Sequence, residues 1–361
     1  MEKTLSIIVP TYNMEKYLRK CLDSLIVSDE NMRRLEVLVI NDGSKDSSSQ
    51  IAHEYETKYS QTFRVIDKEN GNYGSCINKG LEVATGKYVK VLDSDDYYDS
   101  TVLDRYINFL CNCEADVVFS DYSIVDDEGE CLSEFTFDLP TEKTFSLQEV
   151  PSEMVIHLAH FTVTYKAEIF RSLNYKQTEG ISYTDDEWVF KPMMEVEHAV
   201  YFPHTLYFYF RGREGQTFDK TVLKKSLEQR IIVAREMVSY YENNISRCKK
   251  DSLTFVTEKL TRKVAALYSL HLILFASKEN NKRISEVDSI LKQVSKDTYD
   301  RLNNVTNKYG WRYIRQWRLC GCSYYTPLVV AYRIARRLRD MMNNKDVLVD
   351  YLPSQLKRRT L

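Results

Sequence analysis

The first 92 residues alternate between short apolar runs and longer stretches with helical periodicity. Apolar residues recur every three or four positions over 14–26, 47–59 and 73–84, which predicts amphipathic helices. The apolar runs predict buried strands, at 5–10, 35–40, 63–67 and 88–92. Strands that alternate with helices indicate a parallel sheet with helices on both faces. In such sheets ligands bind at the carboxyl ends of the strands, so the residues just after each strand are the first candidates for chemistry.

The pattern is less regular after residue 100 and becomes helical after about residue 220. We expect helices at 102–111 and 185–194, strands at 116–119 and 161–166, a hairpin with its turn at 127–129, and two strand pieces around Pro203-His204. Later periodic segments predict a helical region, with helices at 222–242, 251–277, 284–294 and 324–343. The chain therefore divides into an α/β domain over 1–220 and a helical extension over 221–361.

Composition and charge narrow the class of protein. With 361 residues and 43% hydrophobic residues, the chain suits a folded globular protein. Its eight cysteines form no C-x-x-C pair, which argues against zinc and for buried thiols. We see no signal peptide and no apolar run of about 18 residues, and therefore expect a cytosolic protein with at most a peripheral membrane contact.

An acidic cluster, Asp93-Ser94-Asp95-Asp96, follows the strand expected at 88–92. Carboxylates so close repel one another unless a cation or hydrogen bonds compensate. A hard divalent cation would do so, and would also hold a diphosphate. The alternative is an acidic cap on the next helix, which would explain Asp96 or Asp99. A second acid, Asp42, follows the strand at 35–40, so we expect both groups at one edge of the sheet.

These segments resemble the family 2 glycosyltransferases. The matching stretches occur in the family's order, at 6–13, 39–44 and 84–96, and the resemblance covers roughly residues 1–220. It implies the GT-A fold of nucleotide-diphospho-sugar transferases, a Rossmann-like mixed sheet, here with a C-terminal helical extension. It also implies a hexosyltransferase-like enzyme that uses Mn²⁺ or Mg²⁺.

The resemblance assigns roles to residues that match the family's motifs. Pro10, Thr11 and Tyr12 would lie beside the nucleoside, and Asp42 would bind the base. A carboxylate accepts a hydrogen bond from an imide N–H, which uracil has and cytosine lacks, so a UDP-sugar is favoured, although guanine also carries a ring N–H. Asp93 would lie near the ribose, and Asp95 would be the metal ligand.

The segment Tyr183-Thr184-Asp185-Asp186-Glu187-Trp188 carries the candidate general base. By resemblance, Asp186 would take a proton from an acceptor hydroxyl, which predicts an inverting transfer. Asp185 stands where the family usually has Glu, and is grouped with the substrate-binding residues. Trp188 would stack on an acceptor sugar or pack against the sheet. The alternative for this segment is a capping box formed by Thr184 and Glu187.

Two further segments depart from the family's pattern. Arg211 and Arg213 would pair with phosphate oxygens, or would be incidental surface arginines. The family's metal-binding histidine has no counterpart nearby, which leaves a third protein ligand open. Ile77 stands where many relatives carry a donor-binding arginine, and Lys79 or Lys90 would have to supply that charge.

The C-terminal segment 311–361 holds 11 Lys and Arg residues against 3 Asp and Glu residues. Its periodic stretch places Leu328, Val329, Tyr332, Ala335 and Leu338 on one side, and four arginines largely on another: Arg333, Arg336, Arg337 and Arg339. Such a helix suits an anionic membrane surface or packs on the catalytic domain with a solvated basic face. No recognition motif for nucleic acid accompanies the charge.

The leading hypothesis is an inverting glycosyltransferase that extends a bacterial polysaccharide of the cell envelope, capsule or lipopolysaccharide, on an acceptor glycan that is lipid-linked. A sugar-1-phosphate nucleotidyltransferase is an alternative, but such enzymes carry a Gly-rich loop after the first strand, where this chain has Pro10-Thr11-Tyr12-Asn13. A non-catalytic glycan- or membrane-binding scaffold is another, and retention of the acids argues against it.

Overall fold

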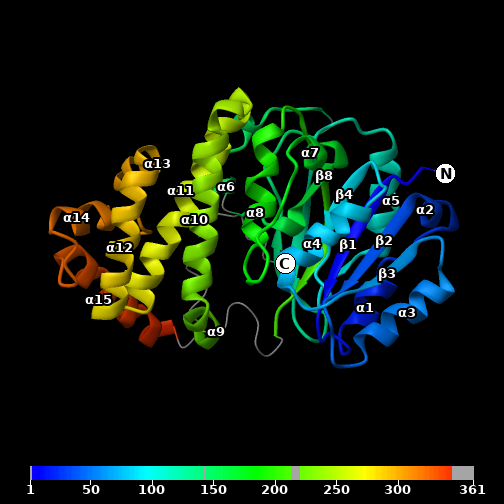
Figure 1. Ribbon diagram of the computed structural model, residues 1–361, viewed down its shortest axis with the longest axis horizontal. Helices are drawn as coiled ribbons and strands as arrows, with labels where there is room; N and C mark the ends of the chain where they lie inside the picture. The colour runs from blue at the N-terminus through cyan, green and yellow to red at the C-terminus, as the bar shows by residue number, and fades with distance from the viewer. Residues whose placement is uncertain (1, 142, 156, 213–219, 344–361) are drawn as a thin grey trace. The chain divides into compact units, whose positions relative to one another are not determined.

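The structure is a computed structural model that describes residues 2–141, 143–155, 157–212 and 220–343. These residues form two compact units (Figure 1). The sheet unit contains residues 2–212 together with Lys249–Ser252, and the helical unit contains residues 220–248 and 253–343. Lys249–Ser252, which we expected in the helical extension, thus belongs to the sheet unit, where the Ser252 hydroxyl donates to the Val196 carbonyl at 2.5 Å.

The sheet unit is built on one mixed sheet, as the GT-A resemblance implied. Its strand order is β3-β2-β1-β4-β8-β6-β9-β5, with β7 paired to β6. The first four strands of that order are parallel, whereas β8 is antiparallel to both β4 and β6. The strands are β1 (Leu5–Thr11), β2 (Leu35–Asn41), β3 (Phe63–Asp67), β4 (Tyr88–Val91), β5 (Tyr97–Tyr98), β6 (Val117–Val125), β7 (Cys131–Phe135), β8 (Val163–Lys166) and β9 (Ala199–Phe210).

The helices of this unit are mostly short. The helix α4 packs on β1 and β2, where a Cβ on Gly80 would lie 2.6 Å from an Ile8 methyl carbon (Figure 1). The α-helices of the unit are α1 (Leu18–Asp23), α2 (Asp29–Arg34), α3 (Ser48–Lys58), α4 (Asn72–Val83), α5 (Ser100–Cys111), α6 (Ser152–Val155), α7 (Ala167–Ser172) and α8 (Asp185–Phe190). Short 3₁₀ turns lie between them, including η2 (His160–Thr162) and η3 (Pro192–Glu195).

Several elements differ from the prediction, and three of the differences have an evident cause. The helix expected over 14–26 is only α1, because Asn13 has a positive φ and a turn occupies the next residues. The helix expected over 185–194 stops as α8 at Phe190, and Pro192 begins a 3₁₀ turn. The two strand pieces around Pro203-His204 are one strand, β9, whose register on β6 shifts around Asp121 and so absorbs the proline.

One of the family motifs, at 84–88, has a structural explanation. The buried Glu36 carboxylate accepts from the Ser6 hydroxyl at 2.5 Å and from the Thr85 backbone N–H at 2.8 Å. The Gly86 N–H donates to the Ser6 hydroxyl at 2.8 Å, and a Cβ on Gly86 would lie 2.5 Å from the Ser6 nitrogen. This motif therefore joins the starts of β1 and β4 tightly, at the sheet edge opposite the expected ligand site.

The helical unit packs α10, α11 and α12 side by side (Figure 1). Trp317 and Tyr268 are buried at its centre, and the Arg318 guanidinium pairs with Asp288 at 2.6 Å. Its helices are α9 (Lys220–Lys225), α10 (Leu227–Asn244), α11 (Leu253–Ser269), the π-helical turn η6 (Leu270–Leu274), α12 (Lys278–Val294), α13 (Lys296–Arg301), α14 (Tyr313–Leu319) and α15 (Pro327–Asn343). Within the described ranges, no helix combines the length and apolar character needed to cross a bilayer.

The helix α15 corrects the predicted division into an apolar and a basic side. Val329 and Tyr332 are buried as expected, but Leu338 is 52% exposed and Arg336 only 5% exposed. Ile334, Leu338 and Met341 instead form an exposed apolar ridge, because α15 packs through the opposite side, where the aliphatic stem of Arg336 takes part in the packing.

Candidate functional site

The carboxyl ends of β1, β2 and β4 meet at one edge of the sheet, because all three strands are parallel. Pro10 and Thr11 end β1 and are buried, and the Thr11 carbonyl accepts from the Asp42 N–H at 2.8 Å. Tyr12 is 46% exposed. Of the three residues that sequence placed beside a nucleoside, only Tyr12 presents a large surface to solvent.

Asp42 is nearly covered, with 3% of its surface exposed. Its Oδ1 accepts from the Lys68 Nζ at 2.5 Å and from the Gly71 N–H at 2.9 Å. Both of these donors share Oδ1, and the buried Cys76 thiol is a further hydrogen-bonding neighbour of this carboxylate. Lys68, which sequence reasoning did not select, also donates to the Ser75 hydroxyl at 2.8 Å.

Asp93 is held from two sides. The Tyr73 hydroxyl on α4 donates to Asp93 Oδ1 at 3.1 Å, and His160 Nε2 lies 2.9 Å from Asp93 Oδ2. Burial, followed by the charges of Asp93 and Asp185, raises the pKa of Tyr73 well above its usual value, so the phenol stays protonated and donates. The carboxylate of Asp93 is thus fixed in orientation before any ligand binds.

Asp96 is buried, and the suggestion that it caps a helix is wrong. It accepts hydrogen bonds from the Tyr207 hydroxyl and from the Phe210 N–H, the latter at 2.7 Å, so it ties β9 to the end of β4. The cap of α5 is Asp99, which accepts from two N–H groups of the first turn. Burial, and after it the charges of Asp95 and Asp93, raises the pKa of Asp96 well above the usual carboxyl range.

Asp95 is partly exposed, as is Asp93, whereas Asp96 is buried. Within the described ranges no group of three or more His, Cys, Asp or Glu side chains could hold a metal ion. Mg²⁺ or Mn²⁺ that binds with a diphosphate takes most of its ligands from phosphate and water, so one or two carboxylates suffice to hold it. The donor set around Asp95 is therefore compatible with a metal that binds together with a nucleotide.

The helix α8 carries three acids in its first turn, Asp185, Asp186 and Glu187. Asp185 has a side chain that is 44% exposed, and Asp186 is partly exposed. The capping-box alternative is wrong, because Thr184 makes no side-chain cap, and the buried Glu187 pairs with Lys191 and accepts from the Thr178 N–H. The solvent-facing acids of this turn are thus Asp185 and Asp186.

Trp188 lies on the buried side of α8 and is 1% exposed. Its ring stacks on Phe170 at 4.6 Å between centroids and meets Tyr165 edge-on at 5.8 Å. No face of the indole is offered to a sugar in this structure, so the packing alternative describes Trp188 and the acceptor-stacking role is not supported.

The helix α4 joins the two ends of the site. Asn78 exchanges hydrogen bonds with the Gln177 backbone, and the Gln177 amide donates to Thr184, the residue before Asp185. Gly74 faces the same segment, and a Cβ there would lie 1.9 Å from the Thr178 carbonyl oxygen. A side chain at position 74 would therefore push the segment that carries α8 away from α4.

The substitutes proposed for the missing arginine lie elsewhere. Ile77 is buried and Lys79 pairs with Glu82 at 3.0 Å. Lys90 is fully buried and donates to the Phe161 carbonyl at 2.6 Å, and burial lowers its pKa to about 7. Of the lysines described above, only Lys68 touches a candidate ligand-binding acid.

Arg211 directly follows β9, and its N–H donates to the Val125 carbonyl at 2.8 Å. The Phe210 N–H donates to Asp96, so this end of β9, just before Arg211, lies at the acidic cluster. Arg213, the other candidate for diphosphate binding, lies outside the described residues.

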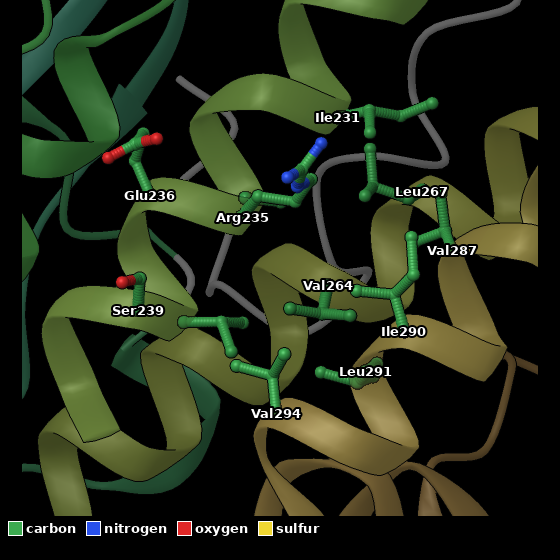
Figure 2. Close-up of a pocket in the computed structure, with 12 residues that line it drawn as sticks. Ile231, Arg235, Glu236, Ser239, Val264, Leu267, Val287, Ile290, Leu291 and Val294 are labelled. Atoms are coloured by element: carbon green, nitrogen blue, oxygen red, sulfur yellow. The ribbon is translucent and has the colours of Figure 1, made fainter. Parts of the chain in front are cut away.

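The helical unit contains a hollow of about 220 Å³ between α10, α11 and α12 (Figure 2). Its lining is mostly apolar, with side chains such as Val264, Leu267 and Leu291, and its charged members are Arg235 and Glu236. These residues offer no constellation for proton transfer or metal binding, so the candidate chemistry lies in the sheet unit.

The mixed sheet, with acids after its parallel strands, has the GT-A-like arrangement, and the family comparison agrees with that fold. Residues 6–165 match the model described as "Glycosyl transferase family 2". It is 42% identical over 102 residues to "Uncharacterized glycosyltransferase MG025 homolog" of Mycoplasma pneumoniae, which covers 28% of this chain and 34% of that protein. It is 29% identical over 186 residues to "Glycosyltransferase GlyA" of Streptococcus pneumoniae, covering 48% and 26%.

The chain thus spans about a third or less of the length of these curated relatives. A solved structure of S. aureus TarS, residues 1–349 in complex with UDP-GlcNAc, has the same fold with a TM-score of 0.68. That likeness covers 95% of this chain and 92% of the other, at 20% sequence identity.

Proposed function

We propose that this protein is an inverting glycosyltransferase that moves a sugar from a nucleotide-diphosphate donor, a UDP-sugar, to a hydroxyl of a glycan acceptor. The observation that carries the proposal is that Asp42 and Asp93 follow parallel strands at one sheet edge, and that His160 lies between Asp93 and Asp185 of α8. Buried, oriented acids after parallel strands suit a nucleotide, and exposed acids nearby suit proton transfer.

The assigned reaction is a single displacement. The acceptor oxygen attacks the anomeric carbon and its proton passes to Asp186, while the bond from that carbon to the diphosphate oxygen breaks and the nucleotide leaves. Asp42 receives the base, Asp93 lies by the ribose, and Arg211 faces the diphosphate. Asp95 would hold Mg²⁺ or Mn²⁺, which would offset charge on the leaving diphosphate.

The test is a panel of nucleotide sugars with Mn²⁺ or Mg²⁺, read out as release of free nucleotide and as transfer to glycan acceptors. UDP-GlcNAc heads the panel, because TarS was solved with it. We expect turnover with a UDP-sugar that stops when EDTA is added and returns with the metal. Asp127→Asn, a change on the exposed hairpin turn, is the matched control for the acidic variants. No metal-dependent response to any donor would overturn the enzyme assignment.

We also propose that α15 contacts an anionic membrane surface, where a lipid-linked acceptor of an envelope polysaccharide would be found. The support is its apolar ridge of Ile334, Leu338 and Met341, with exposed Arg337 beside it in a strongly basic segment. In flotation with vesicles containing phosphatidylglycerol, we expect the protein to float, and the Leu338→Gln/Met341→Gln variant to stay behind. Ile290→Gln, at another exposed apolar site, is the control. Equal flotation with neutral phosphatidylcholine vesicles, or none, would contradict the contact.

A further inference from the structure

His160 lies between the two groups of acids, and the proposed mechanism gives it no role. It stands in η2, just before β8, and is 7% exposed. Its Nε2 is 2.9 Å from Asp93 Oδ2, and its Nδ1 is 3.9 Å from Asp185 Oδ2. Nδ1 is buried and makes no hydrogen bond within the described part of the chain. One imidazole therefore faces a donor-side acid with one nitrogen and an acceptor-side acid with the other.

The backbone that carries His160 is held firmly. Fully buried Lys90 donates to the Phe161 carbonyl at 2.6 Å and to the Val163 carbonyl at 3.4 Å, so it anchors η2 to β4. The imidazole meets the ring of Tyr73 edge-on at 6.1 Å and that of Phe161 at 5.1 Å between centroids. These two ring contacts and the hydrogen bond to Asp93 hold the imidazole with its nitrogens toward Asp93 and Asp185.

Charge supports the same arrangement. Burial lowers the pKa of His160, but the charge and hydrogen bond of Asp93, and then the charge of Asp185, outweigh burial and the charge of Lys90, so that the pKa is raised above its usual value. A protonated imidazole donates from both nitrogens, whereas a neutral one donates from one only. The surroundings thus favour the form that can serve both carboxylates.

We propose that His160 is a positioning residue that couples the donor end of the site to the acceptor end. Nε2 fixes the carboxylate of Asp93, and Nδ1 attracts Asp185, which holds the first turn of α8 and with it Asp186. The inference rests on the proposed glycosyl transfer and adds to it the residue that sets the distance between the ribose side and the base.

Two substitutions separate the two contacts. In His160→Gln the amide nitrogen takes roughly the place of Nε2, so the Asp93 contact survives and the Asp185 contact is lost. In His160→Asn the amide nitrogen takes roughly the place of Nδ1, so the Asp185 contact survives and the Asp93 contact is lost. For the Gln variant we expect about a tenfold loss of transfer kcat with unchanged donor KM. For the Asn variant we expect about a tenfold rise in donor KM. Effects of this size are typical of residues that orient a ligand-binding side chain without touching the ligand. His157→Gln, at another buried histidine of the same segment, is the control. Identical kinetic profiles for the Gln and Asn variants would overturn the coupling role.

A double-mutant cycle of thermal stability tests the contact between His160 and Asp185 without measuring catalysis. The Tm losses of His160→Gln and Asp185→Asn should be non-additive, because either change removes the same contact. The pair His157→Gln and Asp185→Asn should be additive. Additive Tm losses in the first pair would rule out the contact between His160 and Asp185. A wild-type protein inactive on every donor would instead refute the proposed function and leave this cycle to decide on His160.

Discussion

The two ends of the candidate site differ in how completely the protein satisfies their acids. Asp42 is 3% exposed, and one of its oxygens is already bonded to Lys68 and Gly71. Asp185 and Asp186 lie on the first turn of a six-residue helix, and the side chain of Asp185 is 44% exposed. The end that we assign to the donor is built in advance, whereas the end that we assign to the acceptor is partly open to solvent.

This difference suits the two partners that we propose. A nucleotide carries the same base and diphosphate at every turnover, so a preformed, desolvated pocket lowers the cost of binding it. An acceptor must bring its hydroxyl close to the base and then leave, which an exposed carboxylate permits. Changes at the open end should therefore affect transfer, and changes at the covered end should affect affinity and stability.

The largest effect is expected from Asp186→Asn at the open end. Loss of the base should lower the transfer kcat by about 10²–10⁴-fold, while donor binding survives. Product formation measures the first quantity, and calorimetric titration with the nucleotide measures the second. If donor binding is lost as well, Asp186 has a structural role and the contrast between the two ends fails.

Asp42→Asn should act on affinity. A hydrogen bond to a charged acceptor contributes about 1.5–3 kcal/mol, so UDP should bind about 10–100-fold more weakly. The preference for UDP over CDP should shrink in parallel, because cytosine has no imide N–H to donate. Titration of both nucleotides checks this, and an unchanged UDP affinity would remove Asp42 from the base site.

Lys68→Met should act mainly on stability. It removes a cationic partner from a buried carboxylate, which should cost about 1–3 kcal/mol of unfolding free energy. Denaturant unfolding of this variant beside Lys45→Met, at an exposed position, measures the difference. Equal stability of the two variants would mean that Asp42 does not depend on Lys68.

The last prediction concerns Lys90, which anchors the His160 turn between the two ends and acts on the pH dependence of stability. Burial lowers its pKa to about 7 from an ordinary value of 10.5. Below pH 7 the Lys90 ammonium is protonated in both the folded and the unfolded chain, so it does not make the unfolding free energy depend on pH. Between 7 and 10.5 only the unfolded chain holds the proton, so wild-type stability should rise with pH relative to Lys90→Met. Lys79→Met should keep the wild-type slope, and parallel curves for wild type and Lys90→Met would show that Lys90 titrates normally.

Most strands of the sheet, and the half of the candidate site that follows its parallel strands, could be predicted from the sequence. The apolar runs located β1, β2, β3 and β4 to within a residue or two, and parallel pairing then brought Asp42 and Asp93 to one edge. Periodicity could not reveal contacts made through folding. His160 lies 67 positions from Asp93, and Lys68 lies 26 positions from Asp42, and neither belongs to a motif. The roles of Asp96 and Trp188 depended on which neighbours the fold packs against them, which no local pattern records.

The hydrogen-bonded cluster of Ser6, Glu36, Thr85 and Gly86 limits what a match to this family says about catalysis. These residues keep two strands together far from the candidate base, and the family match ends at residue 165, before α8. A descendant that had lost Asp186 would keep this cluster, fold normally and still be recognised. Whether such a relative is a working catalyst or an inactive copy is therefore best judged at positions 185 and 186, outside the stretch by which the family is detected.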